Sequence, residues 1–561
     1  SDFEFKAPLA LFIDPLSLSL CLMITFVCGL IHIYAVAYMT DDPSQVRFFA
    51  LLNLFVAAML LLVLAENLPL LYMGWEGVGF CSYALIGFWY RDEKNATAGR
   101  KAFIVTRIGD TALIIAIVWL FELCGTESIQ ELNQMGQDLP STTVTMLGFL
   151  LLIGAMGKSA QLPLSVWLPD AMAGPTPVSA QIHAATMVTA GVYLLMRMFP
   201  LVSGSPEALS AIAITGGLTA CYGATCAVAQ RDLKRILAYS TISQIGYMIL
   251  GVGAGGVVAA TFHLIVHAFF KALLFLGAGC VITALHHEQD IYRMGGLRRS
   301  LPLTFWPFLA GTLCLAGIPL TGGFFSKDSI LEAVWRQGGM LYGFLFCLAL
   351  LSALLTAFYT FRMLYLVFLG DNSGGKAQVA VPRLMEWVLV PLALLGLFGG
   401  ALNLPAYLGT GILADFMGSV TLTSAPQLSH STELALQLLA AIASLWGISL
   451  AIYRYGGKRR LDRLTDADCP PSLLTEFCLN GWYLDSLYDF LLVRPYKWLA
   501  KTLWVRVDEG MIDDSFDRFA SLLGRAGQLL GSWGSGRVSA YILSMTTGAA
   551  LVIAYMAWVA P

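Results

Sequence analysis

The stretch "FHLIVHAFFKALLF" (residues 262–275) is apolar almost throughout, yet it carries His263, His267 and Lys271 at four-residue spacing. In an α-helix, residues four apart fall on nearly one face, slipping by about 40° per step at 3.6 residues per turn. The spacing therefore predicts a helix with three titratable groups in one row. Titratable groups inside an apolar helix are costly and mark a candidate functional site.

The sequence around this stretch is that of a membrane protein. Of its 561 residues, 57% are hydrophobic and only 12% are Asp, Glu, Lys or Arg, against roughly 25% charged residues in soluble proteins. The net charge of −3 implies no nucleic-acid partner. The 11 cysteines are scattered singly, so we expect no iron–sulfur cluster and no zinc site, and no cofactor in this chain.

Apolar runs recur along the whole chain and predict an all-α polytopic bundle with about 14 transmembrane helices. Two runs, 143–170 and 301–335, are too long for simple spans. They are interrupted by "SAQLPLSVWLPD" (159–170) and "AGIPLTGGFFSKD" (316–328), where proline and glycine favour discontinuous helices. The predicted spans are 15–39, 47–67, 69–90, 101–124, 143–170, 178–199, 208–229, 236–254, 257–285, 301–335, 340–369, 385–403, 433–453 and 537–559.

The charge of the loops predicts the orientation of the spans. One set of alternate loops holds 18 basic residues, whereas the opposite loops hold only Arg336. The positive-inside rule places the basic set in the cytoplasm, so both chain ends are expected on the non-cytoplasmic side. The basic residues are Arg47, Arg91, Lys94, Arg100, Lys101, Arg231, Lys234, Arg235, Arg293, Arg298, Arg299, Lys376, Arg383, Arg454, Lys458, Arg459, Arg460 and Arg463.

The spans also predict a domain organisation. Two five-span sets, 47–199 and 208–369, each have an interrupted fourth span, so the second set starts in the opposite orientation. Such an inverted repeat with paired broken helices points to a transport site. An N-terminal span (1–46), C-terminal spans (385–453) and a last anchor (537–561) flank this core and a polar region, 454–536. That region predicts amphipathic helices on the cytoplasmic side, either at the membrane interface or along neighbouring subunits.

Four charged residues lie near the middle of apolar spans without a counter-ion nearby in the sequence. They are expected to face the interior, where they either pair across helices or titrate, because an unpaired charge costs about 2.5–3.5 kcal/mol at a helix centre. These residues are Glu76, Lys158, Lys271 and Lys327.

Other polar residues in the spans have either a structural or a functional role. Arg107 and Asp110 in "VTRIGD" (105–110) either neutralise each other or join the functional set. Asp328 is either functional or a local partner of the preceding lysine. His183 and His263 are either hydrogen-bonded core residues or relay groups.

Proton relay is the chemistry that these residue types favour. Burial disfavours the charged form of a lysine, and a carboxylate partner restores it, so moving the partner switches the lysine between holding and releasing a proton. Histidine bridges such sites because it titrates near neutral pH and offers two ring nitrogens. Metal binding by the histidine row is not expected, because no carboxylate or cysteine joins it.

Several long motifs make the chain resemble the antiporter-like L-subunit family of respiratory complex I, the proton-pumping NADH:quinone oxidoreductase. The resemblance covers essentially the whole chain. It implies a proton-translocating membrane-arm subunit driven by quinone reduction elsewhere in the complex. The motifs are "GWEGVGFCSYALIGF" (74–88), "VTRIGD" (105–110), "GKSAQLPLSVWLPDAMAGPTPVSAQIHAATM" (157–187), "LKRILAYSTISQIGYM" (233–248), "FHLIVHAFFKALLFLGAG" (262–279), "MGGLRRS" (294–300) and "FFSKDSIL" (324–331).

The resemblance also implies roles for individual residues. Glu76 and Lys158 match the carboxylate–lysine pair of the family's first half-channel. Lys271, with His267 and His263, matches the central connection between the two half-channels.

The second half-channel ends in Lys327, which favours the L type over the sister M type, since the M type carries Glu there. Asp110 and His183 match polar residues of the first path. Gln181 departs from the usual apolar residue beside that histidine, and either extends a hydrogen-bonded path or packs against a water.

The same resemblance implies other membrane-arm subunits and lipids as partners, especially the sister M subunit, and the inner (cytoplasmic) membrane of a bacterium as the location. Family members usually have 16 spans, so the 14 counted here leave the first two outside this sequence. The sequence starts at Ser1 without Met, and nothing in its first residues resembles a signal peptide. Two alternatives stay open: an Mrp-type cation/proton antiporter subunit, and a scaffold that moves no protons.

Overall fold

A computed structural model describes residues 8–370, 379–405, 408–409, 411–418, 428–456 and 472–560. Within these ranges the regular structure is helical, apart from three isolated β-bridges. This confirms the predicted all-α class. Five of the basic loop residues, Lys376, Lys458, Arg459, Arg460 and Arg463, lie outside the described residues, as does part of the predicted amphipathic region.

Twelve helical segments of the described chain are long and apolar enough to cross a membrane, so the predicted count of 14 is not confirmed. The segments are Pro15–Tyr38 (α1), Gln45–Leu64 (α2), Glu93–Cys124 (α4), Ser141–Lys158 (α6), Thr176–Arg197 (α7 and α8), Pro206–Ala229 (α10), Leu233–Gly253 (α11), Val257–Ala284 (α12), Gly339–Leu369 (α15 and a π-helical turn), Arg383–Asn403 (α16, α17 and a 3₁₀ turn), His430–Tyr455 (α19) and Val538–Val559 (α25).

The other two predicted spans differ for physical reasons. Segment 69–90 does form a helix, α3 (Leu68–Ile86), but its glycines and Glu76 lower its hydropathy. Segment 301–335 consists of two shorter helices, α13 (Pro302–Ala316) and α14 (Gly322–Gln337). Helix α4 also begins earlier than expected, at Glu93, because Asp92 caps it by accepting a hydrogen bond from the backbone of Lys94.

Both predicted interruptions are present. Helix α6 ends at Lys158, and residues 159–169 form turns. Helix α13 ends before Gly317, whose φ of 71° lies in the left-handed region that favours glycine. Helix α14 then starts at Gly322, so the second break is shorter than predicted and "GFFSKD" (323–328) is helical.

A third break separates α7 (Thr176–Ala184) from α8 (Met187–Arg197), and the sequence did not predict it. Thr186 has φ −123° and ψ −108°, and its hydroxyl group donates to the backbone carbonyl of Gln181 at 2.7 Å. No proline or glycine lies at this point of the chain, so the usual signal of a broken helix is missing.

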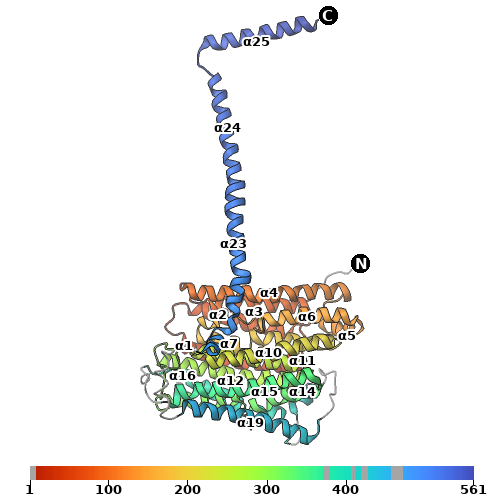
Figure 1. The fold of residues 1–561 in the computed structure, drawn as a ribbon, viewed down its shortest axis with the longest axis vertical. Helices are drawn as coiled ribbons and strands as arrows, with labels where there is room; N and C mark the ends of the chain where they lie inside the picture. The colour runs from red at the N-terminus through yellow and green to blue at the C-terminus, as the bar shows by residue number, and fades with distance from the viewer. Residues whose placement is uncertain are drawn as a thin grey trace. The chain divides into compact units, whose positions relative to one another are not determined.

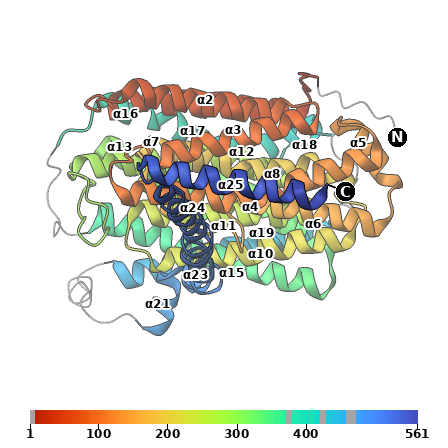
Figure 2. The same ribbon diagram turned by 90° about the horizontal axis from the view of Figure 1, so that it is seen from above.

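The described chain divides into two compact units, Ser1–Leu484 and Asp485–Pro561. In the first unit the helices run side by side in one bundle (Figure 1), and the view from above places α2 at one edge of it (Figure 2). The α7–α8 segment, α11 and α12 form its centre, because their apolar windows are completely buried. Helix α12, a member of the second predicted repeat, packs against α11, α13 and α14 of that repeat and also against α7 of the first.

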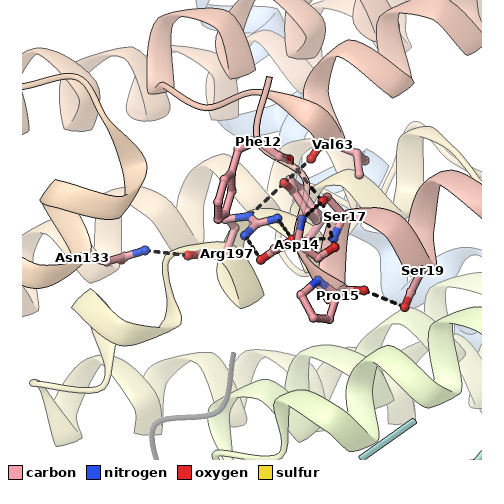
Figure 3. A network of polar contacts seen from close by, with 9 residues as sticks. Phe12, Asp14, Pro15, Ser17, Ser19, Val63, Asn133 and Arg197 are labelled. Carbon is pink, nitrogen blue, oxygen red and sulfur yellow. Dashed lines mark hydrogen bonds and ion pairs between the residues drawn. The ribbon is translucent and has the colours of Figure 1, made fainter. Parts of the chain in front are cut away.

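A buried ion pair ties the first helix of the bundle to α8 (Figure 3). The guanidinium group of Arg197 donates to both carboxylate oxygens of Asp14, at 2.6 and 2.9 Å. Its Nε donates to the hydroxyl group of Tyr193, which in turn donates to the carbonyl of Val63. This cluster therefore joins α1, α2 and α8 through polar contacts.

The second unit is helical over nearly all of its length. From α23 (Arg494–Leu503) through a π-helical stretch (Trp504–Asp513) to α24 (Asp514–Trp533) the backbone stays helical. Apolar residues of α24 recur at three and four positions, as in Phe516, Phe519, Leu523 and Leu530, and all four are exposed. The predicted helices of this region are therefore present in the described residues, and its amphipathic character follows from the spacing of the apolar residues alone.

Candidate functional site

The first part of the candidate site is built where α4 and α6 cross with almost no side chain between them. A Cβ atom added to Gly157 would lie 3.2 Å from the Cα atom of Gly109, so glycine at both positions permits the close approach. Asp110 and Lys158 directly follow these glycines. The crossing therefore brings them together, and Nζ of Lys158 donates to Oδ2 of Asp110 at 3.1 Å. Both side chains are buried, with exposed fractions of 0% and 1%.

Helix α3 encloses this ion pair from a third side. The indole Nε1 of Trp75 donates to the free carboxylate oxygen of Asp110 at 2.6 Å, and the Lys158 ammonium lies 5.9 Å from the centre of the indole ring. One turn further along, a Cβ atom added to Gly79 would lie only 2.5 Å from the ammonium nitrogen. Gly79 therefore leaves the space that the Lys158 ammonium occupies.

Glu76 lies beside this pair but contacts a different cation. Its carboxylate accepts a hydrogen bond from Nη1 of Arg107 at 2.6 Å, and Nε of Arg107 lies 3.8 Å from Asp110. The four groups thus form a series, Glu76–Arg107–Asp110–Lys158. The sequence predicted the Arg107–Asp110 neighbourhood but not that Arg107 stands between the two carboxylates, because that depends on how α3 and α4 pack.

The second part of the site lies on the central helix α12. Lys271 is fully buried, and its ammonium group donates to the hydroxyl group of Ser240 at 2.5 Å and to the carbonyl of Leu237 at 3.1 Å. Both acceptors belong to α11. They are neutral, so Lys271 differs from Lys158 in having no carboxylate among its contacts in the described chain.

The histidines of α12 continue the row, since α12 is one helix from Val257 to Ala284 as the spacing predicted. The rings of His263 and His267 lie 6.2 Å apart, and Nδ1 of His263 is 2.9 Å from the hydroxyl oxygen of Ser326 on α14. His183 on α7 packs its ring 4.8 Å from that of Phe275, also on α12. The structure therefore gathers all three histidines around one helix.

Lys327 lies at the break between α13 and α14. Its ammonium group donates to the carbonyl of Leu315 at 2.5 Å, in the last turn of α13. Carbonyls in the last turn of a helix have no partner within the helix, and the helix dipole favours a cation there. The Lys327 ammonium also lies 6.0 Å from the centre of the Tyr247 ring. The broken helix thus supplies a site for the cation.

The structure brings the predicted residues together in two groups. Glu76, Asp110 and Lys158 form the first group. The second lies along α12, which carries His263, His267 and Lys271, and Ser326, which contacts His263, directly precedes Lys327 on α14. Among the described residues, no hydrogen bond joins Lys158 to this second group.

Several buried polar atoms near these groups have no hydrogen-bond partner within the described residues. They include both ring nitrogens of His183 and His267, Nε2 of His263 and both amide atoms of Gln244. Gln181 donates to the carbonyl of Leu52 at 3.3 Å, while its Oε1 has no partner. Buried polar atoms of this kind are typically bridged by ordered water. No sequence pattern points to Gln244, because a single glutamine in an apolar helix has no distinguishing spacing.

A cavity of about 660 Å³ opens among the ends of α4, α11 and α12 that carry the basic residues. Asp170 lines this cavity and forms ion pairs with Lys101 at 2.6 Å and with Arg235 at 2.8 Å. Lys234 also lines the cavity; it is buried and donates to the carbonyls of Met172 and Gly174. Lys234 therefore places a buried ammonium group at the wall of this cavity.

The sequence matches two family profiles. The family described as NADH:quinone oxidoreductase/Mrp antiporter, TM, matches residues 65–356, and the family described as NADH-Ubiquinone oxidoreductase (complex I), chain 5 N-terminus, matches residues 2–49. Two solved structures are similar in fold. A chain of the Mrp complex from Dietzia sp. DQ12-45-1b superposes with a TM-score of 0.71 at 25% identity, covering 100% of this chain and 58% of that one. A chain of the archaeal membrane-bound sulfane sulfur reductase has a TM-score of 0.66 at 23% identity, covering 78% of this chain and 87% of that one.

Curated relatives match over nearly the whole length. NADH-quinone oxidoreductase subunit L of Escherichia coli (strain K12) is 43% identical over 559 residues, which cover 99% of this chain and 88% of that protein. Subunit L of Mycobacterium tuberculosis (strain ATCC 25618 / H37Rv) is 44% identical, and the match covers 97% of this chain and 85% of that protein. NADH-ubiquinone oxidoreductase chain 5 of Cryptococcus neoformans is 38% identical, covering 95% and 82%. The chain therefore belongs to the subunit L family of NADH-quinone oxidoreductase, within the antiporter-like membrane proteins that also include Mrp subunits.

Proposed function

We propose that this chain is the proton-translocating L subunit in the membrane arm of a proton-pumping NADH:quinone oxidoreductase. It takes part in the enzyme as a subunit, with no redox centre, cofactor or metal of its own, and quinone reduction elsewhere in the complex drives it. The observation that carries the proposal is the burial of three lysines, Lys158, Lys271 and Lys327, in one membrane bundle. Their exposed fractions are 0%, 0% and 5%. Such groups inside a membrane protein mark ion pathways.

Next to Lys158, the guanidinium group of Arg107 can act as a switch. Arg107 bonds to Glu76 and lies 3.8 Å from Asp110, the partner of Lys158. If Arg107 moves from Glu76 toward Asp110, it competes with Lys158 for one carboxylate. Because charges interact strongly in a low-dielectric interior, this competition favours release of the Lys158 proton.

The central row then passes the proton on. Lys271 contacts only neutral acceptors, so its charged form is held less firmly than that of Lys158. His267 and His263 extend from it along α12 toward the helix that carries Lys327, and their unpaired ring nitrogens can exchange protons through bridging water. The cavity beside Lys234 is the proposed entry for protons from the cytoplasm.

The outer face of α3 and α4 supports a neighbouring subunit as partner. The side chains of Glu76 and Arg107 are 25% and 43% exposed in the isolated chain. If lipid covered this face, the ion pair would lie in hydrocarbon, at a cost of several kcal/mol. We assign the neighbour as the sister M subunit, with lipids covering the apolar faces, and the location as the inner (cytoplasmic) membrane of a bacterium.

The runner-up is a subunit of an Mrp-type monovalent cation/proton antiporter. The superposition with a chain of the Dietzia Mrp complex favours it, whereas the whole-length match to L subunits favours the leading proposal. Purification of this chain from its membrane separates the two. An antiporter subunit would purify without NADH-oxidising subunits, and vesicles that contain it would exchange sodium for protons.

The test uses the complete complex in vesicles, with proton uptake measured per NADH oxidised. Lys158→Ala and Lys271→Ala are expected to lower this ratio while the complex stays assembled, and Glu76→Gln should do the same. Arg91→Ala, at an exposed position just before α4, serves as the control and should leave the ratio unchanged. An unchanged ratio in the Lys158 and Lys271 variants would show that the chain is a scaffold and moves no protons.

A further inference from the structure

The starts of α13 and α16 lie side by side at one end of the bundle (Figure 2). Helix α16 (Arg383–Trp387) continues through one residue with helical dihedral angles into α17 (Leu389–Phe398), which also packs against α13. The hydroxyl group of Thr304, in the first turn of α13, donates to the carboxylate of Glu386 at 3.1 Å. The residues around this bond therefore form one local surface.

Arg298 places a cation at this surface in a fixed position. Its backbone N–H donates to the carbonyl of Phe368 at 3.2 Å, and its guanidinium group lies 5.2 and 5.7 Å from the ring centres of Phe305 and Trp306. Cation–π contacts of this length are attractive. The side chain is exposed and forms no ion pair within the described residues. Its charge is therefore available to an anion from outside the chain.

Two further arginines make this surface more positive. Arg299 directly follows Arg298, and Arg383 begins α16; both side chains are exposed. Segments 297–316 and 379–398 hold these three arginines and only one acidic residue, the glutamate bonded to α13. The three arginines belong to the loops that the positive-inside rule places in the cytoplasm, where the adjoining leaflet carries anionic lipids.

An apolar row leads from the arginine of α16 along the outer face of α17. Trp387 lies four residues after Arg383 and is 64% exposed. Val390, Leu394 and Phe398 follow at helical spacing, and all three are exposed. The row from Trp387 to Phe398 is about 16 Å long at 1.5 Å per residue, roughly half of the hydrocarbon core of a bilayer. It therefore matches the depth of one leaflet.

We propose that this surface binds one anionic phospholipid of the cytoplasmic leaflet. Its phosphate contacts Arg298, Arg299 and Arg383, and an acyl chain lies along the exposed row of α17. Trp306 and Trp387 lie at the level of the headgroup, where tryptophan is enriched in membrane proteins. The order of cation, aromatic ring and apolar row follows the lipid from its headgroup to its tail. This binding does not depend on proton translocation.

The surface differs from the face of α3 and α4, which we assign to the sister subunit. There the ion pair of Glu76 and Arg107 is partly exposed near the middle of the spans. In contrast, residues 388–398 contain no polar side chain, and the charges of this surface lie only at its cytoplasmic rim. Charge at the rim above an uninterrupted apolar row favours a lipid over a protein subunit as the occupant.

The test uses the complete complex in phosphatidylethanolamine vesicles that contain a trace of photoreactive lipid, with a diazirine in its acyl chain. This lipid is phosphatidylglycerol in one set of vesicles and zwitterionic phosphatidylcholine in the other, and peptide mass spectrometry locates the label after illumination. Phosphatidylglycerol should label residues 387–398 more strongly, whereas both lipids should label the exposed side chains of Leu438 and Ile442 on α19 alike. Equal labelling of residues 387–398 would mean ordinary bulk lipid, and no labelling there by either lipid would mean a protein cover. Either result would overturn the site.

Arginine variants show whether the headgroup is the cause of the preference. Arg298→Gln/Arg383→Gln should lower the ratio of phosphatidylglycerol to phosphatidylcholine labelling about fivefold for each arginine removed. Arg298→Lys/Arg383→Lys should keep most of it, because an ammonium group still attracts phosphate as a point charge. Arg91→Gln/Arg293→Gln removes two exposed arginines from the same set of loops and should label like wild type. A wild-type ratio in Arg298→Gln/Arg383→Gln, or an equal fall in the control, would show that these arginines do not hold the lipid.

Discussion

At the scale of single residues, the three buried lysines differ in the groups that accept hydrogen bonds from their ammonium groups. Lys158 donates to a carboxylate, Lys271 to a hydroxyl group and a carbonyl, and Lys327 to a carbonyl at a helix end. The sequence predicted the lysines themselves, because a charge in an apolar span stands out. It did not predict their acceptors, because these come from other helices and depend on how the helices cross.

Gly79 offers a direct test of the space around Lys158. Gly79→Ala places a methyl group 2.5 Å from the ammonium nitrogen, so the flexible end of the lysine must move away from Asp110. We expect the complex to assemble and its proton-to-NADH ratio to fall toward that of Lys158→Ala. Gly29→Ala adds a methyl group with nothing within 4 Å and is the control. A ratio equal to wild type in Gly79→Ala would show that the position of the ammonium group does not matter for translocation.

At the scale of elements, the breaks in the helices place the candidate site. The sequence predicted two of them from proline and glycine, and both are present after Lys158 and at Gly317. The break at Thr186 has no such signal, because a threonine hydroxyl bonded to the carbonyl of Gln181 accompanies it. Breaks made by side-chain hydrogen bonds depend on tertiary packing, and a single sequence does not reveal them.

The contact between α1 and α8 predicts a pH dependence of stability. Burial alone would raise the pKa of Asp14, but the hydrogen bonds and charge of Arg197 outweigh it and hold that pKa below its ordinary value of 3.8. A lowered carboxyl pKa means that the stabilisation is complete above the ordinary value and is lost as pH falls through the lower, folded-state value. Asp14→Asn leaves the buried guanidinium group unpaired, which costs about 3 kcal/mol at neutral pH.

Thermal melting of the purified complex checks this prediction. The variant should melt at a lower temperature than wild type by the same amount from about pH 5 to pH 8, with the difference shrinking only under more acidic conditions. Asp41→Asn, at an exposed position after α1, should melt like wild type throughout. A difference that already vanishes near pH 6 would mean that the carboxylate of Asp14 is not its source.

At the scale of the whole molecule, the composition decided the all-helical membrane class, but two aspects of the organisation were beyond it. The predicted count of 14 spans is not confirmed, because glycine and Glu76 lower the hydropathy of α3 and because α13 and α14 are separate helices. The contact between Gln437 on α19 and Asp328 on α14 was also missed, because these residues are far apart in the sequence and only the packing of the two helices brings them together.

The apolar face of α24 yields a prediction about assembly. Phe519 and Leu523 are 61% and 58% exposed in the isolated chain, and Ser521 lies on the opposite, polar face of the same helix. An apolar face of this length is unfavourable in water, so in the complex it should lie against neighbouring subunits or the membrane surface. Burial of each of these side chains is worth about 1.5–3 kcal/mol, so replacing both with aspartate should weaken the attachment of this region substantially.

Native mass spectrometry of the complex after a graded detergent challenge measures that attachment. Phe519→Asp/Leu523→Asp should release this chain from its neighbours at lower detergent than wild type, whereas Ser521→Asp adds charge to the same helix and should release it at the wild-type concentration. If both variants dissociate alike, added charge and not loss of the apolar contact is responsible. If neither differs from wild type, the face of α24 does not hold the assembly together, and its apolar residues serve only the helix's place at the membrane surface.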